Sequence, residues 1–429
     1  MKAVPLPAAL FTLNRERLIQ KLPPRSLAVL NANDIMPTNA DGAMGHLQNA
    51  DLFYLTGVHQ EETILLLAPD AFDPNQREIL FVRQPNEHLA IWEGHKLTKE
   101  QATAVSGIKN VKWLAEFPTV FRSLMCELEN VFLNSNEHQR ADVTVETRDA
   151  RFVRDVQKTF PLHKYHRLAP LLHELRVVKS QYEINAIQAA CDLTGKGFKR
   201  VCKFLKPGVN EAEVEAEFAH EFIRAKGQFA YPPIIAGGVN NNILHYTQND
   251  QVCKNGDLLL LDVAAGLGNF MSDLTRTIPV SGKFSRRQKQ VYNAVLRIFR
   301  AQVAALVPGK TTKDLRAECE EITAKECVDL GLLKMSQLKK QTPENPAVRP
   351  FFMHGVSHPL GLDVHDVTYN HLKISPGWVL TVEPAIYIKA ENFGVRIENT
   401  VLVTENGQRD LMAGIPIEAD EIEALMNRR

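Results

Sequence analysis

Short apolar runs alternate with polar segments in the first part of the chain. Four of these runs have the length of buried strands, and they are SLAVLNAN (26–33), ETILLLAPD (62–70), REILFVRQ (77–84) and NVFLNSN (130–136). The segments between them carry apolar residues at helical spacing. The pattern therefore predicts an N-terminal α/β domain that ends near Leu168.

A long helical segment follows, with the sequence LAPLLHELRVVKSQYEINAIQAACDLTGKGFKRVCKFL. Ser180 and Glu183 have the spacing of a capping box at the start of its second helix. A chain of 429 residues exceeds the roughly 100 to 200 residues of one domain, so two domains are expected. We place the first at 1–170 and the second at 171–429, with the boundary within 165–175.

The second part contains a weak internal repeat, in which FLKPGVNEAEV resembles ALVPGKTTKDL about a hundred residues later. In each copy a helix is predicted to end at Pro-Gly, and a polar cap then starts a new amphipathic helix. The residues concerned are Pro207-Gly208 with Asn210 and Glu213, and Pro308-Gly309 with Thr311 and Asp314. Two unrelated helix breaks would look alike, but both copies are followed by strands that contain a pair of acids. This favours a duplication.

The first acidic pair lies in DLLLLDVAAGLGNFMSDLTRTIPV, where two apolar strands flank the turn-prone Gly266-Leu267-Gly268. This pattern predicts a β-hairpin. A two-residue turn at Leu267 and Gly268 would place Asp262 opposite Asp273, with Cβ atoms about 5 Å apart on one face. The two carboxylates would then repel each other unless a cation lies between them.

The second pair lies in WVLTVEPAIYIKAENFGVRIENTVLVT, in which Glu383 and Glu398 are equidistant from a turn at Ala390-Glu391. Pro384 favours a bulge in the first strand. Either pair alone would be explained by two exposed acids on a solvated hairpin face. Two such pairs in related halves, each embedded in Leu, Val and Ile, favour a buried cluster of four carboxylates instead.

Such a cluster is costly unless it is protonated or binds metal, because burying unpaired charge is unfavourable. Two divalent cations would balance the four negative charges. Ligands rich in carboxylates and free of thiols suit Mn, Mg, Co or Zn, and one imidazole favours a transition metal. The histidines for this role come from FFMHGVSHPLGLDVHDV, which contains His354, His358 and His365, although each alone would be read as structural.

Composition narrows the class of protein. Hydrophobic residues make up 45% of the chain and charged residues 23%, as in globular proteins. Lys and Arg together number 50, as do Asp and Glu, so no charge surplus draws the whole protein to nucleic acid or anionic lipid. The six cysteines form no C-x-x-C pair, and no stretch approaches the roughly 20 apolar residues that span a bilayer. With prolines interrupting the apolar N-terminal run, these features predict a cytoplasmic protein with reduced thiols and no membrane association.

These segments closely resemble those of the pita-bread dinuclear metallopeptidases and, within them, the Xaa-Pro aminopeptidases of the aminopeptidase P type. The resemblance covers nearly the whole chain and is strongest in ILHYTQND, LLLLDVAAGLGNFMSDLTRTIPV, FMHGVSHPLGLDVHD, VLTVEPAIYI and GVRIENTVLVT. The implied fold is α/β (α+β), with an N-terminal domain like that of creatinase and aminopeptidase P. A C-terminal pita-bread domain with an internal pseudo-twofold repeat follows. The implied cofactor is a pair of divalent metal ions, Mn²⁺ foremost, with Co²⁺ or Zn²⁺ as alternatives.

The resemblance also implies roles for individual residues. The implied metal ligands are Asp262, Asp273, His358, Glu383 and Glu398, of which Asp273 and Glu398 bridge both metals. Glu383 is in addition the implied proton carrier. The other matched residues are His245, His354 and His365, which line the substrate pocket and act in catalysis, Arg396 and Tyr387, which lie behind the ligands, and Trp92 at the substrate mouth.

The first domain carries its own part of the resemblance, in QNADLFYLTGVHQEETILLLAPD, which implies a homodimer or homotetramer. For Trp92, plain packing is nearly as good an explanation as a role at the substrate mouth. Two departures from the family pattern, Gln248 after HYT and Asn269-Phe270-Met271, touch no ligand. They leave the preferred peptide length and the preferred first side chain open.

The implied reaction is hydrolysis, by a hydroxide that bridges two metals, of the bond between the N-terminal residue and a proline in second position. Proline makes this bond a tertiary amide without an N–H donor, so the pocket must recognise the shape of the ring. The alternative is prolidase, which shares the metal site and hydrolyses Xaa-Pro dipeptides. A non-catalytic pita-bread binding protein is the second alternative, although such proteins usually lose metal ligands and this chain has all five.

Overall fold

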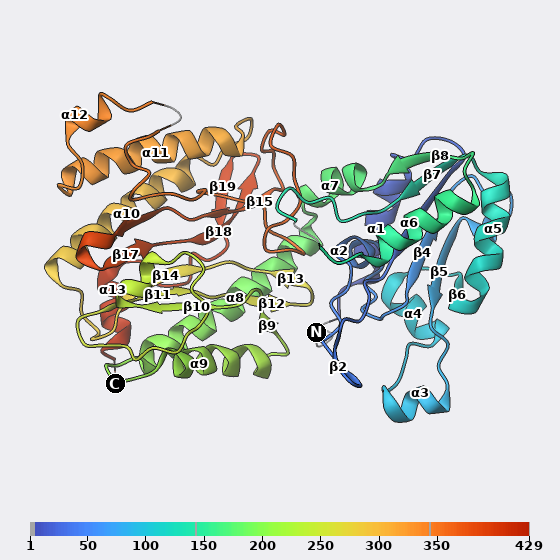
Figure 1. Cartoon of the computed structure of the whole chain (residues 1–429), viewed down its shortest axis with the longest axis horizontal. Helices are drawn as coiled ribbons and strands as arrows, with labels where there is room; N and C mark the ends of the chain where they lie inside the picture. Colours follow the sequence, from blue (N-terminus) through green and yellow to red (C-terminus); the bar gives the residue numbers. More distant parts are fainter. Residues whose placement is uncertain (1–4, 142–143, 343–344, 429) are drawn as a thin grey trace. The chain divides into compact units, whose positions relative to one another are not determined.

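The computed structural model describes residues 5–141, 144–342 and 345–428, and the chain divides into two compact units, Met1–Arg176 and Val177–Arg429. The first unit is built on one six-stranded sheet, and the second on several small antiparallel sheets between pairs of helices (Figure 1). Within the described ranges, no helix is long and apolar enough to cross a membrane.

The sheet of the first unit has the strand order β6-β5-β4-β1-β7-β8. Its strands are β1 (Ser26–Asn31), β4 (Ile64–Leu67), β5 (Glu78–Val82), β6 (Val111–Trp113), β7 (Asn130–Leu133) and β8 (Lys164–Arg167). The four apolar runs form the four central strands, so their prediction as strands is confirmed. β1 pairs antiparallel with β4 and parallel with β7, which makes the sheet mixed. The edge strands β6 and β8 are short and partly polar, and the apolar pattern did not predict them.

Helices cover both faces of this sheet. The helices of this unit are α1 (Ala8–Ile19), α2 (Ala50–Thr56), α3 (Glu87–Trp92), α4 (Lys99–Ser106), α5 (Phe117–Glu127), α6 (Arg148–Thr159) and α7 (Ala169–Val177). In Figure 1, α3 and the small hairpin of β2 (Pro37–Asn39) and β3 (Gly42–Ala43) project away from the sheet. On one face, Val29, Leu66 and Phe81 of the sheet pack in one cluster with Phe121 of α5 and Val156 of α6. This buried cluster is the apolar core that the strand pattern requires.

Gly57 ends α2 with a left-handed φ of +66°, and an added Cβ would lie 2.1 Å from Cε2 of the buried Phe11. We expect Gly57→Ala to destabilise the first unit by about 2 kcal/mol or more, because backbone strain and overpacking add. Gly94→Ala is the matched control, since Gly94 also has a positive φ, +82°, but nothing within 4 Å of its Cβ position. Urea unfolding of both variants measures the difference, and equal losses would show that the contact with Phe11 does not matter.

The second unit repeats a helix pair followed by antiparallel strands. The first half contains α8 (Gln181–Phe204), α9 (Glu211–Arg224), β9 (Gln228–Phe229), β10 (Ile234–Gly237), β11 (Leu258–Asp262), β12 (Ala265–Leu267), β13 (Phe270–Met271) and β14 (Thr275–Pro279). The second half contains α10 (Arg286–Ala305), α11 (Thr312–Asp329), α12 (Met335–Leu338), β15 (Val379–Val382), β16 (Ala385–Ile388), β17 (Phe393–Arg396), β18 (Asn399–Thr404), β19 (Gly407–Asp410) and α13 (Ala419–Met426). Figure 1 shows the strands lying between the α8–α9 pair and the α10–α11 pair.

The helix breaks predicted for the two copies of the repeat are confirmed. Gly208 and Gly309 both have left-handed φ angles, +93° and +95°, which suit glycine after proline in a tight turn. The predicted capping boxes of α8, α9 and α11 are all formed, at Ser180 with Glu183, Asn210 with Glu213, and Thr311 with Asp314. The same local chemistry therefore starts corresponding helices in the two halves.

The two halves of the second unit meet along a seam between their strands. The Glu398 backbone N–H donates to the Thr275 carbonyl oxygen (3.0 Å), and the two residues form an isolated antiparallel bridge. The Thr275 hydroxyl also donates to Glu398 Oε2 (2.6 Å). This seam brings the acid-bearing hairpin of each half against that of the other.

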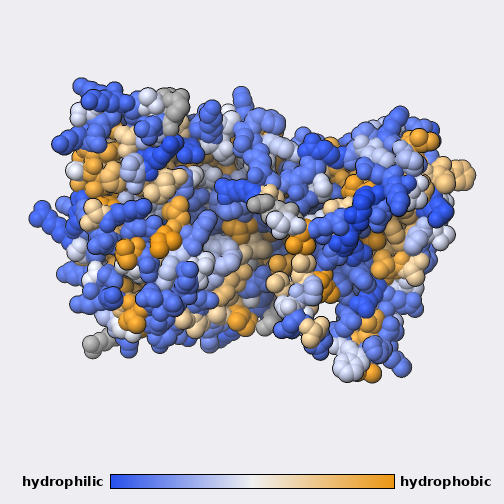
Figure 2. Space-filling view, viewed as in Figure 1, coloured by the Kyte–Doolittle hydropathy of each residue, from blue (hydrophilic) through white to orange (hydrophobic). Residues whose placement is uncertain are grey.

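The surface and the cysteines agree with the expectation of a globular protein with reduced thiols. Figure 2 shows hydrophilic residues over most of the visible face, with apolar residues in scattered positions. All six cysteines lie within the described residues and are free thiols, and five of them are buried.

Candidate metal centre

The first acidic pair lies on a hairpin whose turn differs from the prediction. Leu267 of β12 lies opposite Phe270 of β13, which makes Gly268 and Asn269 the two turn residues. Both have left-handed φ angles, +59° and +67°, which glycine and asparagine tolerate and leucine does not. The predicted turn at Leu267 and Gly268 is therefore wrong by one residue.

The shifted turn moves the pairing of the two strands by two positions. Asp262 of β11 lies opposite Thr275 of β14, so the predicted pairing with Asp273 is wrong. Because side chains along a strand alternate with period two, Asp273 stays on the same face as Thr275 and lies diagonal to Asp262. The Tyr231 hydroxyl lies 2.6 Å from Asp262 Oδ1 and 2.7 Å from Asp273 Oδ1. The two carboxylates thus lie close together by a diagonal contact.

The second acidic pair has the predicted register. The ladders on both sides of the acids share one alignment, which puts Glu383 opposite Glu398. Pro384 divides the first strand into β15 and β16, because proline has no N–H to donate to the ladder. Instead, the Glu383 N–H donates to the carbonyl oxygen of Val356, and the Glu398 N–H donates to that of Thr275. Each acid is therefore held by the backbone of a neighbouring segment.

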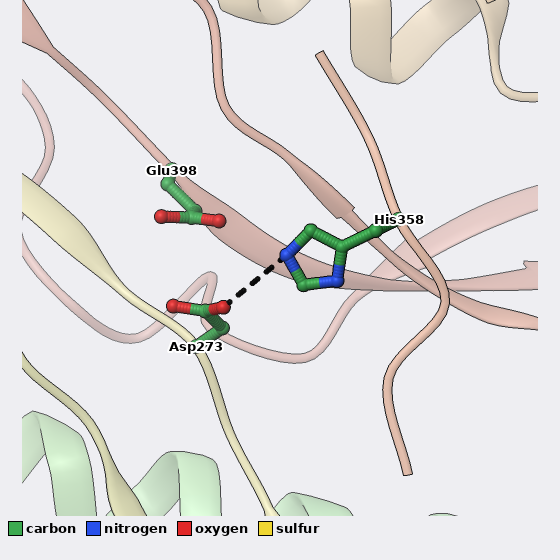
Figure 3. Close-up of side chains that lie close together, drawn as sticks. All are labelled: Asp273, His358 and Glu398. Carbon is green, nitrogen blue, oxygen red and sulfur yellow. Dashed lines mark ion pairs between the residues drawn. The ribbon is translucent and has the colours of Figure 1, made fainter. Parts of the chain in front are cut away.

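His358 lies against these carboxylates. Its Nε2 is 3.5 Å from Asp273 Oδ2 and 3.7 Å from Glu383 Oε1. Its Nδ1 is 3.0 Å from the Pro359 carbonyl oxygen, so Nδ1 carries the hydrogen and Nε2 presents its lone pair to the acids. Figure 3 shows Asp273, His358 and Glu398 converging, and one ligand atom from each lies within 4.8 Å of the others.

Asp273 and Glu398 are buried in this cluster, and Asp262 and Glu383 are half-buried beside them. Burial and the charge of Asp262 raise the pKa of Asp273 well above its ordinary value, and burial and the charge of Glu398 do the same for Glu383. Burial and the charge of Asp273 raise the pKa of Glu398. Divalent cations would offset this cost, and carboxylates with one imidazole and no thiol are ligands that suit them. The residues present therefore fit a divalent metal centre.

A hydrogen-bonded chain of side chains lies behind the acids. The buried Arg396 guanidinium donates to Asp262 Oδ2 (2.7 Å) and to the Tyr387 hydroxyl (2.6 Å). That hydroxyl lies 3.0 Å from His354 Nε2, and His354 Nδ1 lies 2.7 Å from the Gly355 carbonyl oxygen. Burial, followed by the charge of Arg396, lowers the pKa of His354 to about 3. His354 is therefore neutral at pH 7, with Nδ1–H donating to Gly355 and Nε2 accepting from Tyr387.

The remaining predicted residues lie at more exposed positions. The His365 ring lies edge-on to the His358 ring, with centroids 4.3 Å apart, and is open to solvent. His245 is exposed, and its charge contributes to the lowered pKa of His354. Trp92 belongs to the first unit, where it ends α3 and is 77% exposed. Its predicted place at the substrate mouth stays a prediction.

Two residues that contact the acids were not singled out from the sequence. Tyr231, in AYPPII, bridges Asp262 and Asp273 and precedes two prolines, which give no chemical signal. Thr275 binds Glu398 through its hydroxyl. Its position, two residues after Asp273 and hence on the same strand face, was the available signal.

Comparisons with known proteins extend this picture. Residues 185–405 match metallopeptidase family M24, and residues 11–132 match the N-terminal domain of aminopeptidase P. The Xaa-Pro aminopeptidase of Escherichia coli (strain K12) is 33% identical over 431 residues, which cover 97% of each chain. Xaa-Pro aminopeptidase 3 of Homo sapiens is 32% identical over 400 residues, covering 89% of this chain and 77% of the human protein. The solved structure of E. coli aminopeptidase P with the inhibitor Pro-Leu has a TM-score of 0.87 at 32% identity and covers 99% of both chains.

The chain belongs to metallopeptidase family M24 and is a hydrolase that uses divalent metal. Its full-length relatives place it with the Xaa-Pro aminopeptidases, so the family and the fold predicted from the sequence are confirmed.

Proposed function

We propose that this protein removes the N-terminal residue from peptides that carry proline in second position. The observation that carries this proposal is the convergence of two acidic hairpins and His358 in one buried site. It is supported by similarity, over almost the whole chain, to proteins named Xaa-Pro aminopeptidases.

The proposed ligands of two divalent ions are Asp262, Asp273, His358, Glu383 and Glu398. Two such ions, when bound, would lower the pKa of water at the site to about 7, so that it could attack near neutral pH. The Nδ1–H bond of His358 to Pro359 keeps its Nε2 lone pair directed at the ligand position. Mn²⁺ is the proposed ion, because hard carboxylates dominate the set and a single imidazole is added.

Glu383 is the proposed proton carrier. It lies beside His358 at the edge of the cluster, with 19% of its side chain exposed, so it can reach both the attacking water and the substrate. It takes a proton from the water and gives it to the departing proline nitrogen. The exposed His365 ring offsets the charge that develops on the carbonyl oxygen.

His354 and His245 are proposed to line the pocket for the proline ring. His354 is neutral and is fixed by Tyr387 and Gly355, so it offers an imidazole face of defined orientation. A tertiary amide has no N–H to bind, so selection rests on packing around the ring. Trp92 is proposed to contribute at the substrate mouth.

Removal of metal should abolish activity. We expect a strong chelator to reduce the cleavage of an Xaa-Pro-Yaa peptide to background, and Mn²⁺ to restore it more fully than Mg²⁺ does, because Mg²⁺ disfavours imidazole. The measurement is the initial rate after metal removal verified by elemental analysis. Full activity in protein verified to be metal-free would contradict the proposal, and an inactive protein that never binds metal would support a binding module.

A second experiment separates the aminopeptidase from prolidase. Gly-Pro and Gly-Pro-Yaa peptides are compared at equal concentration, and we expect turnover of the longer peptides to dominate. Faster turnover of the dipeptide would assign the chain to prolidase activity.

The proposed setting is a cytoplasmic homodimer or homotetramer. The free state of all six cysteines is compatible with a reducing compartment. Light scattering of the purified protein measures the assembly.

A further inference from the structure

Lys179 and Asp366 form a buried ion pair beside the segment Pro359–Asp366, which follows His358 and is called the histidine segment below. Lys179 Nζ lies 3.0 Å from Asp366 Oδ2, and the two side chains are 1% and 2% exposed. Lys179 precedes the N-cap residue of α8, whereas Asp366 directly follows His365. A fully desolvated pair of this kind is weak evidence for stability, so a role in holding a geometry is the better explanation.

The pair is connected to His358 through one carbonyl group. The Pro359 carbonyl oxygen accepts from Asp366 N–H (2.9 Å) and lies 3.0 Å from His358 Nδ1. The position of Asp366 therefore bears on the hydrogen bond that orients the imidazole. His365 is the neighbour of Asp366 in sequence, and its ring contacts the ring of His358.

The two ends of the histidine segment are held in different ways. At its start, the Leu360 N–H donates to the Val379 carbonyl oxygen of β15, so this end belongs to the sheet. Its far end, at Asp366, is outside any strand and is held by the bond to Pro359 and by Lys179. The Lys179 N–H in turn donates to the Gly377 carbonyl oxygen, in the turn that leads into β15. The lysine thus ties the far end to the same strand that leads to Glu383.

The backbone at Gly361 packs closely against the ion pair. A Cβ on Gly361 would lie 2.2 Å from Asp366 Oδ2 and 3.0 Å from Lys179 Cε. Glycine at this position lets the ion pair lie directly against the segment between the two histidines. The close approach of Gly361 restricts the position of the Asp366 carboxylate.

We propose that Lys179 is a positioning residue, which acts through Asp366 to hold the Pro359–Asp366 segment so that His358 and His365 keep their orientations in the metal centre. This rests on the proposed function of that centre. Lys179 contacts none of the proposed ligands, so its effect passes through Asp366 and the Pro359 carbonyl group.

The test uses two variants and one control. Lys179→Met removes the Lys179 cation from the buried carboxylate and is expected to lose both stability and activity. The double variant Lys179→Met/Asp366→Asn removes both charges, which should restore much of the melting temperature. Phe218→Leu is the control, because Phe218 is fully buried in α9, which packs against α8, β9 and β10. It lowers stability away from the histidine segment.

Two readouts distinguish positioning from general stability. We expect the folded double variant to lose about 10- to 100-fold in kcat and in Co²⁺ affinity, with a changed visible spectrum of the bound Co²⁺ and KM within about threefold of the parent. The control should keep the parent's kcat and spectrum. A double variant with the parent's kcat and spectrum would overturn the proposal.

Gly361→Ala provides a second route if the charge variants do not fold. It keeps both charges but pushes the Asp366 carboxylate aside, so the same loss of kcat and the same spectral change are expected. An unchanged Co²⁺ spectrum and kcat in this variant would also overturn the proposal. Failure of the parent protein itself to bind Co²⁺ or to cleave Xaa-Pro-Yaa peptides would instead count against the proposed function.

Discussion

Replacing the proline of an Xaa-Pro-Yaa tripeptide by alanine should lower kcat/KM by about a hundredfold or more. A pocket shaped for the ring gains packing that alanine cannot supply, and a site that does not need an N–H donor gains nothing from the secondary amide. Acetylation of the N-terminal amine should also suppress cleavage, because the positioning charge is lost and bulk is added. The measurement is steady-state kinetics on three matched tripeptides.

The comparison has a built-in control, since the three peptides share their first and third residues. Equal turnover of all three would rule out an aminopeptidase that selects proline. Loss of cleavage only on acetylation would leave an aminopeptidase without proline selectivity.

His358→Ala should empty the metal centre and reduce kcat by about a thousandfold or more. The Nε2 atom of His358 is directed at Asp273 and Glu383, so its loss removes a proposed ligand from the centre of the cluster. His365→Ala should reduce kcat by about 100- to 1,000-fold while the metals stay bound, because its exposed ring is proposed to act on the substrate. Metal content and kcat of the two variants are measured side by side.

The two variants also test the division of roles between neighbouring histidines. A His365→Ala protein without metal, beside a His358→Ala protein that keeps it, would show that the assignment is reversed. Phe218→Leu, the control for the Lys179 variants, serves here as well. It shows how much activity is lost through reduced stability alone.

The four clustered acids could be predicted from the sequence because their local patterns are strong. Acids at matched distances from a turn, embedded in apolar strands, predict a shared face, and for Glu383 and Glu398 the register was also right. The helix caps were predictable for a similar reason, since each depends on two residues three positions apart. Local chemistry of this kind needs no knowledge of the rest of the fold.

The turn of the first hairpin shows where such reasoning fails. Leu267-Gly268 and Gly268-Asn269 were both plausible two-residue turns, and the requirement for two left-handed residues decides for the second. The error moved the pairing by two positions, and the period of the strand kept both acids on one face. The prediction of a shared site survived a wrong register for this reason.

Two of the contacts between distant segments could not be predicted from the sequence. Tyr231 reaches both acids of the first hairpin, and Lys179 reaches Asp366, yet neither residue has a sequence neighbour that indicates its partner. Such pairs depend on how helices and sheets pack. The type of an individual residue does not predict this packing.

The seam between Thr275 and Glu398 also determines at which stage of its synthesis the chain can become active. The two residues are 123 positions apart in the chain, so the centre closes only after the ribosome has delivered the last strands. A nascent chain that ends before β17 contains Asp262, Asp273 and Glu383 but lacks Glu398, so it cannot complete the proposed ligand set. Peptide cleavage therefore requires that nearly all of the chain has been synthesised.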